Sequence, residues 1–208
     1  HVFDHDPTQD VADLLAGDDD RIAVNEFDFY ETPPELIRDY VLPYLPDDVG
    51  FILEPSAGRG AIVKEIARHR PNMFFGCVEI DPRNVVHLRD AEFSGVVIEA
   101  DFLTWKADLL FDAVVMNPPF TVPGDPLAYI THFEHALECL KPGAPIFCFA
   151  PGGLLFREDK RTAKLRNWLE YNGGELVQLP ADAFKASGTD VNTVLIHIEK
   201  MAYMPDPQ

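Results

Sequence analysis

The fold of this chain is decided by the stretch Val115-Met116-Asn117-Pro118-Pro119-Phe120. It closes an apolar run over residues 111–116 that only Asp112 interrupts, and such a run is typical of a strand buried in a parallel sheet. Proline has no N–H for the next ladder bond, so the chain has to leave the sheet after Asn117. Asn117 is therefore predicted at the carboxyl end of a strand, where open α/β sheets bind their ligands.

The residues at this strand end suit a planar group that carries an amine. The side-chain oxygen of Asn117 and the carbonyl of Pro118 are hydrogen-bond acceptors, and Phe120 offers an aromatic face. A strand that simply ends in a Pro-Pro turn is the alternative interpretation of this motif when it is taken alone.

A glycine-containing loop follows an earlier apolar strand, in the stretch Glu54-Pro-Ser-Ala-Gly58-Arg-Gly60. The two glycines allow a tight turn and a close approach of the backbone to a ligand. Position 63 is Val and no Lys-Ser/Thr pair follows the glycines, so the loop matches neither a dinucleotide fingerprint nor a P-loop. The charge of Glu54 would repel a pyrophosphate and would suit a cationic ligand.

Acidic residues recur at the ends of the next two predicted strands. Glu79 lies 19 residues after Gly60 and is placed to accept hydrogen bonds from two ribose hydroxyls. Asp101 can accept from an adenine amino group, and Phe102 can pack on its ring. Either acid alone is also explained as a helix cap or a surface residue, but their repetition at successive strand ends favours a ligand site.

The alternation of apolar and amphipathic segments predicts a doubly wound α/β fold with helices on both faces. Strands are expected at residues 51–53, 73–80, 96–99, 111–116, 145–150, 175–179 and 191–198. Helices are expected after a Thr32 cap and up to Pro46, and at residues 62–67, 83–90, 127–140 and 158–171. The loop between the last two strands contains no convincing helix, which predicts a mostly parallel seven-stranded sheet with an antiparallel last strand.

Length and composition indicate one globular domain with a full core. The 208 residues are 47% hydrophobic and 11% aromatic, and no apolar segment approaches a membrane-spanning length. Three cysteines (Cys77, Cys139 and Cys148) show no CxxC spacing, which predicts buried thiols in a reducing compartment. We therefore expect a cytoplasmic protein that does not contact a membrane.

The net charge of −18 argues against a broad electrostatic grip on nucleic acid. The charge is uneven, because residues 1–20 hold seven aspartates whereas residues 157–166 are mostly basic. We interpret residues 1–28 as an acidic arm, disordered or partner-binding, residues 29–200 as the folded domain, and residues 201–208 as a flexible tail. The basic cluster is either a solvated helix surface or a local phosphate contact.

Three motifs together resemble the S-adenosylmethionine-dependent methyltransferases. The Glu54-to-Gly60 loop resembles their first motif, and Asn117-Pro-Pro-Phe120 resembles the (D/N/S)PP(Y/F) signature of amino-methyltransferases. The upstream Phe29-Tyr-Glu-Thr-Pro33 is similar to the motif that precedes the cofactor loop in N6-adenine DNA methyltransferases. The order of the motifs is similar to the gamma class of those enzymes, and the resemblance implies their Rossmann-like class I fold.

The resemblance also implies a role for each matching residue. S-adenosylmethionine would be contacted by Tyr30, Thr32, Glu54, Ser56, Gly58, Gly60, Glu79, Asp101, Phe102 and Asn117. The catalytic group would be Asn117, Pro118, Pro119 and Phe120. Phe120 and Phe184 would hold the target ring. Independently of the resemblance, the local positive charge makes Arg157, Lys160 and Arg161 the candidates for a phosphate contact of the substrate. The sulfonium is already a strong electrophile, so neither a metal nor a strong base is required.

The expected substrate is therefore adenine N6 in DNA, flipped out or single-stranded. The chain departs from the gamma class in one respect, because it ends ten residues after Ile198, where those enzymes usually carry a target-recognition domain. Recognition could come from a protein partner, residues 1–28, residues 121–126 or the basic helix. The alternatives are an RNA base amine, a protein glutamine amide, or a non-catalytic partner subunit with the same fold.

Overall fold

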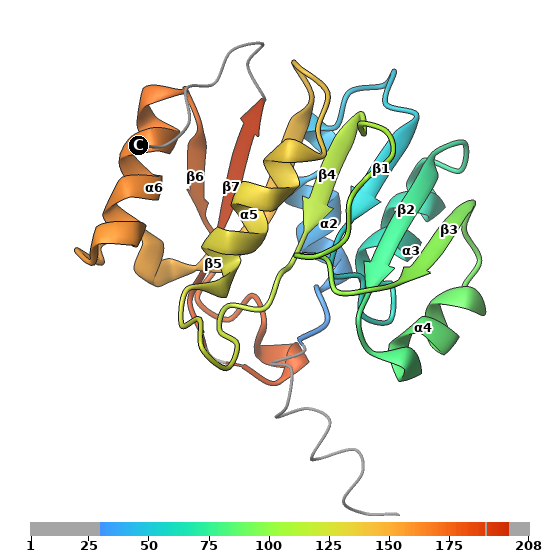
Figure 1. Ribbon diagram of the computed structural model, residues 1–208, viewed down its shortest axis with the longest axis horizontal. Coiled ribbons are helices and arrows are strands. Elements are labelled where there is room, and N and C mark those ends of the chain that lie inside the picture. The colour runs from blue at the N-terminus through green and yellow to red at the C-terminus, as the bar shows by residue number, and fades with distance from the viewer. Residues whose placement is uncertain (1–29, 190, 200–208) are drawn as a thin grey trace, which may run out of the picture.

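The strand that ends at Asn117 lies in the middle of the sheet. Strand β4 (Ala113–Met116) is fully buried and pairs in parallel with β1 (Phe51–Glu54) on one side and with β5 (Pro145–Pro151) on the other. Burial on both faces explains its continuous apolar sequence. The computed structural model describes residues 30–189 and 191–199 (Figure 1).

The sheet has seven strands in the order β3-β2-β1-β4-β5-β7-β6. The remaining strands are β2 (Phe74–Glu79), β3 (Gly95–Glu99), β6 (Glu175–Gln178) and β7 (Thr193–Glu199). Strand β7 runs antiparallel to both of its neighbours, whereas the other pairings are parallel. The predicted fold, a mostly parallel sheet with an antiparallel last strand, is confirmed.

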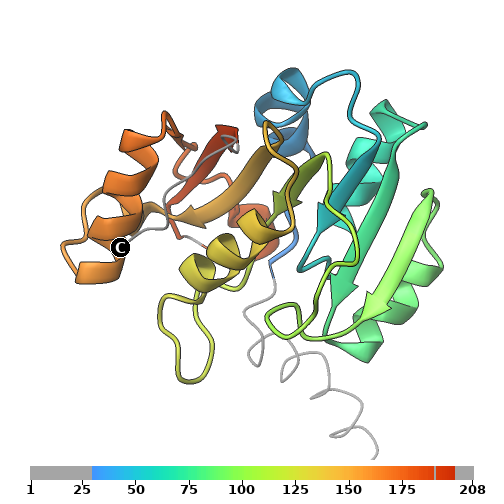
Figure 2. The ribbon, with the colours of Figure 1, turned by 45° about the horizontal axis from the view of Figure 1, so that its top comes forward.

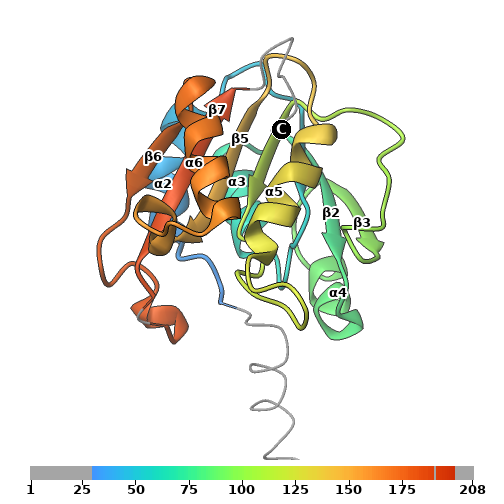
Figure 3. The same ribbon diagram turned by 60° about the vertical axis from the view of Figure 1, so that its left-hand side comes forward.

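Helices cover both faces of the sheet (Figures 2 and 3). Helices α5 (Ala128–Glu138) and α6 (Lys160–Tyr171) lie on one face. Helices α2 (Pro34–Tyr40), α3 (Ala61–His69) and α4 (Pro82–Arg89) lie on the other. Each layer contributes its own apolar cluster, so the sheet is buried on both sides.

The strand order reverses between β1 and β4, and this reversal places the site. Chain connections leave β1 and β4 toward opposite flanks of the sheet, which opens a crevice at their carboxyl ends. The glycine loop, residues 55–60, and the loop after Asn117, residues 117–127, both contribute residues to the lining of this crevice. Three short 3-10 helices complete the described elements: η1 (Leu42–Tyr44), η2 (Gly152–Leu155) and η3 (Lys185–Ser187).

The prediction that Thr32 caps the first helix is wrong. The N-cap of α2 is Pro33, and no side chain makes a capping hydrogen bond there. Thr32 is instead buried against the crevice, with 3% of its surface exposed. Helix α2 also ends earlier than predicted, at Tyr40, because Pro43 cannot donate a backbone hydrogen bond and the chain tightens into η1.

Two predicted segments, the acidic arm at residues 1–28 and the tail at residues 201–208, lie outside the described residues. Over residues 30–189 and 191–199, no helix combines the length and the apolar character that crossing a membrane requires.

A buried carboxylate fixes α2 against α3. Glu65 is 2% exposed and accepts hydrogen bonds from Arg38 at 2.9 Å and Arg68 at 2.6 Å, with His69 Nε2 at 3.1 Å. Burial alone would raise the pKa of Glu65, but hydrogen bonds from Arg38 and His69 and the charge of Arg68 outweigh it and hold the pKa below its ordinary value. Because α2 directly follows Tyr30 and Thr32, this contact also fixes one wall of the crevice.

We predict that Glu65→Ala lowers the free energy of unfolding by about 1–3 kcal/mol at neutral pH, because Arg38 and Arg68 lose their shared carboxylate acceptor. The loss is limited because both arginines are partly solvated. A lowered folded-state pKa contributes stability above the unfolded pKa, so the difference between variant and wild type should shrink as pH falls through the folded pKa. Urea unfolding over a pH series measures this. Glu134→Ala, at an exposed position of α5, is the control; an equal loss in both variants would contradict the prediction.

Candidate functional site

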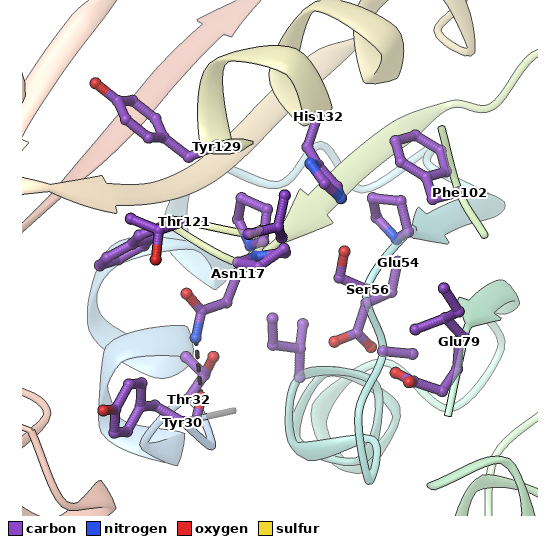
Figure 4. Close-up of a pocket in the computed structure, with 18 of the residues that line it drawn as sticks. Tyr30, Thr32, Glu54, Ser56, Glu79, Phe102, Asn117, Thr121, Tyr129 and His132 are labelled. Carbon is purple, nitrogen blue, oxygen red and sulfur yellow. Dashed lines mark hydrogen bonds between the residues drawn. The ribbon is translucent and has the colours of Figure 1, made fainter. Parts of the chain in front are cut away.

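A cavity of about 760 Å³ occupies the crevice between β1 and β4 (Figure 4). Asn117, Tyr30 and Thr32 lie on one side of it, Glu79 and Phe102 on the other, with the strand end at Glu54 between them. The sequence-predicted residues that line it are Tyr30, Thr32, Glu54, Ser56, Glu79, Asp101, Phe102, Asn117, Pro118, Pro119, Phe120, Arg157 and Phe184. Segments far apart in the chain therefore meet in a single chamber.

The glycine loop is held in shape by Glu79. One oxygen of this carboxylate accepts from the backbone N–H of Gly58 at 2.6 Å, and the other accepts from that of Asp81 at 2.8 Å. Gly58 and Gly60 have φ values of 52° and 82°, a left-handed conformation that side chains rarely adopt. Neither glycine lines the cavity itself; they shape the loop that does. Each Glu79 oxygen keeps a second lone pair for a ligand.

Glu54 is an acidic side chain that is almost completely buried at this site. Its side chain is 2% exposed, and within the described part of the chain its Oε2 atom has no hydrogen-bond partner. Burial raises the pKa of the Glu54 carboxyl well above its ordinary value, and the neighbouring Glu79 carboxylate raises it further. A buried carboxylate in this condition is stabilised by a ligand that brings a positive charge or a strong donor.

The amide of Asn117 has a defined orientation. Its Nδ2 donates to the backbone carbonyl of Tyr30 at 3.0 Å, across 87 residues of sequence (Figure 4). A carbonyl can only accept, so the NH2 group must face Tyr30 and Oδ1 is the acceptor that remains. The loop that carries Phe184 is fixed to the same segment, because the Ser187 hydroxyl donates to the carbonyl of Glu31 at 2.6 Å.

Aromatic rings line the cavity on the side of Asn117. Phe120 is half-buried and contacts Tyr129 of α5 edge-on, with ring centroids 6.4 Å apart. Phe184 is buried and meets Phe149 edge-on at 5.8 Å, so it borders the cavity from a fixed position. Two rings from separate loops can thus bound a planar group near Asn117.

The basic cluster contributes less to the site than its sequence suggests. Arg161 binds Asp125 at 2.9 Å and the Thr131 hydroxyl at 2.8 Å, so it joins α6 to the loop before α5. Lys160 is exposed at the start of α6 and does not line the cavity. Arg157 alone of the three borders the cavity.

Sequence reasoning missed His132. This residue is 7% exposed on α5 and borders the cavity, and its Nδ1 lies 2.8 Å from the carbonyl of Ala128. The available signal was a histidine among the apolar positions of a helix, between Tyr129 and Phe133. That pattern is shared by histidines with a purely structural role, so it did not single out His132.

The chain is similar to two proteins named as Type II methyltransferases. It is 33% identical over 197 residues to the Type II methyltransferase M.TthHB8I of Thermus thermophilus, an alignment that covers 82% of this chain and 44% of that protein. It is 36% identical over 110 residues to the Type II methyltransferase M.CvrRI of a Paramecium bursaria Chlorella virus, covering 52% and 27% respectively. The chain thus spans less than half the length of either relative. No protein-family model matches it.

Solved structures share the fold. A class I S-adenosylmethionine-dependent methyltransferase described as putative, from Listeria monocytogenes, superposes with a TM-score of 0.65 at 18% identity, covering 85% of this chain and 62% of that one. TrmN from Thermus thermophilus superposes with a TM-score of 0.54 at 18% identity, covering 80% and 47%. The architecture is therefore the class I methyltransferase fold, as the sequence predicted.

We predict that Glu54→Gln stabilises the ligand-free protein and that the gain grows as pH rises above 4.5, the ordinary pKa of a glutamate. A carboxyl whose folded-state pKa is raised binds its proton more tightly when folded, so ionisation of the unfolded chain above that pH favours unfolding. Glutamine has no such ionisation.

Urea unfolding at about pH 5 and about pH 8 measures this difference. Glu92→Gln, at an exposed position, is the matched control and should show no such trend. A stability gap between Glu54→Gln and wild type that stays constant or narrows with pH would contradict the interpretation of Glu54.

Proposed function

We propose that this chain transfers a methyl group from S-adenosylmethionine to an exocyclic amino group, namely adenine N6 in DNA. The observation that carries the proposal is the oriented amide of Asn117, which presents an acceptor at the carboxyl end of β4 in the same cavity as Glu54 and Glu79. This arrangement supplies acceptors for a planar amine on one side and for a cationic, ribose-bearing ligand on the other.

The residues present fit the cofactor. Among residues 30–189 and 191–199, no group pairs with Oε2 of the buried Glu54 carboxylate, which matches a ligand that carries an ammonium and a sulfonium. Glu79 would accept from the ribose hydroxyls, and Asp101 with Phe102 would hold the adenine. The methionine end of the cofactor would be contacted by Tyr30, Thr32, Ser56 and the loop shaped by Gly58 and Gly60. S-adenosylmethionine, when bound, supplies a methyl group on an electrophilic sulfonium.

On the target side, the chain has to make a poor nucleophile reactive. The amine of adenine is weak because its lone pair is delocalised into the ring. Asn117 Oδ1 and the Pro118 carbonyl would accept its two N–H groups, favour a tetrahedral nitrogen and direct the lone pair toward the methyl carbon. Methyl transfer would form the N–C bond as the S–C bond of the donor breaks, and one N–H proton would leave by way of Asn117 or water. Pro119 fixes the turn, and Phe120 and Phe184 bound the base.

DNA is favoured as the substrate by the two relatives, each a Type II methyltransferase by name. A base stacked within a duplex cannot enter a cavity, so the target would be flipped out or single-stranded. Arg157, in the segment before α6, borders the cavity and would contact a phosphate, with Lys160 and Arg161 in the first turn of α6. We place catalysis in residues 29–200 and assign target recognition to a protein partner, to residues 1–28, to residues 121–126 or to the basic helix.

The proposal is tested by tritiated-methyl transfer to unmethylated DNA, RNA and protein, followed by digestion and identification of the methylated product. N6-methyladenine from DNA is the expected product. A methylated RNA base or glutamine would retain the chemistry and replace the substrate. Absence of transfer to all three pools, with cofactor bound, would identify a non-catalytic subunit.

We predict that two substitutions separate chemistry from binding. Asn117→Ala should lower methyl transfer by about 100-fold or more because the target amine loses its acceptor, while the Kd of S-adenosylhomocysteine changes little. Glu79→Ala should raise that Kd by about 10-fold or more, because a charged acceptor is lost and Gly58 is released.

Single-turnover kinetics and calorimetry measure the two effects. Asn167→Ala, at an exposed position of α6, is the control and should behave as wild type. Normal transfer by Asn117→Ala would overturn the assigned mechanism.

A further inference from the structure

His132 is a buried polar side chain for which the proposed transfer of the methyl group has no use. It projects from α5 into the space between Asn117 and Phe102 (Figure 4). Its ring lies 6.0 Å from the ring of Phe102, with 31° between their planes. The side chain thus borders the part of the cavity formed by Asp101 and Phe102, which follow β3.

The protonation of this imidazole follows from its contacts. The carbonyl of Ala128 can only accept, so Nδ1 must carry a proton that it donates at 2.8 Å. Burial lowers the pKa of His132 below its ordinary value, although Asp101 and Asp125 act in the opposite direction. The neutral ring therefore has an unprotonated Nε2, and no hydrogen bond to this atom is found among residues 30–189 and 191–199.

Asp101 provides a second acceptor beside the same space. Its Oδ1 accepts from the backbone N–H of Leu103 at 3.0 Å, which leaves Oδ2 for a ligand. Two acceptors at one end of a cavity suit a group with two donor hydrogens, and they repel a carbonyl oxygen at the same position. The amino group of adenine has those two hydrogens, whereas hypoxanthine has a carbonyl there.

We propose that His132 Nε2 accepts the second N–H of the cofactor's adenine amino group and so makes the site selective for adenine over a base with a carbonyl at that position. The inference rests on the proposed use of S-adenosylmethionine. It assigns His132 to the cofactor side because its aromatic neighbour Phe102 lies across the cavity from Asn117 (Figure 4), and the acceptor Asp101 directly precedes Phe102 after β3.

The test compares two ligands within each variant. S-adenosylhomocysteine carries an amino group where S-inosylhomocysteine carries a carbonyl. Calorimetry gives the selectivity ratio, which is the Kd of S-inosylhomocysteine divided by the Kd of S-adenosylhomocysteine. His132→Phe keeps a ring but removes Nε2. It should therefore raise the Kd of S-adenosylhomocysteine by about 3- to 10-fold, which corresponds to the loss of one neutral hydrogen bond. Binding of S-inosylhomocysteine should stay unchanged or improve, so the ratio falls. A partial folding defect would weaken binding of both ligands by the same factor, so it cannot by itself lower the ratio or hide a selective loss.

Two further variants complete the design. His132→Gln can present an amide oxygen at the position of Nε2 and should keep part of the ratio. His135→Phe is the matched control: its Nε2 already contacts the carbonyl of Trp105 at 3.0 Å, and its ring meets Phe102 edge-on at 4.7 Å, but it does not line the cavity. It should leave the ratio at the wild-type value.

The outcomes separate this inference from the proposed function. A wild-type ratio in His132→Phe would overturn the inference. Normal binding of S-adenosylhomocysteine together with impaired methyl transfer would also overturn it, because that result would assign His132 to the target side. Failure of the wild-type protein to bind S-adenosylhomocysteine at all would overturn the proposed function as well.

Discussion

The buried carboxylate of Glu54 constrains the rest of the site. It is at the carboxyl end of β1, where the sheet is covered on both faces, and Glu79 lies close enough to raise its pKa further. Desolvating one acid beside another is unfavourable unless a positive charge or a donor joins them. In the ligand-free protein, this unfavourable burial lies at the point where the strand order reverses. The positive charge of the proposed cofactor would offset it.

Hydrogen bonds between distant segments give the site a fixed geometry. Glu79 joins the glycine loop to the end of β2 by accepting from Gly58 and Asp81. Asn117 joins the β4 loop to the segment before α2 through the carbonyl of Tyr30. Side chains that bind a ligand in our proposal are thus already fixed by backbone groups, which lowers the cost of ordering them when a ligand binds.

The sequence predicted the fold because its signals are local. The apolar run before Asn117, the glycines at 58 and 60, and the acid at 79 each depend on a few neighbouring residues. The cap at Thr32 was wrong because burial against the crevice overrode the local capping preference. His132 was missed because its role depends on which ring lies across the cavity. The ion pair with Asp125 and the hydrogen bond to the Thr131 hydroxyl, both made by Arg161, likewise join segments 30 or more residues apart.

Proton release on ligand binding tests the central claim most directly. If Glu54 is the buried group that a cationic ligand stabilises, it loses its proton as S-adenosylmethionine binds, because the ligand's charge restores the ionised form. Calorimetry at about pH 5.5, in buffers of different ionisation enthalpy, counts the protons exchanged. The account predicts binding with net proton release that diminishes as pH is raised. Binding without proton release across that range, or no binding, would contradict it.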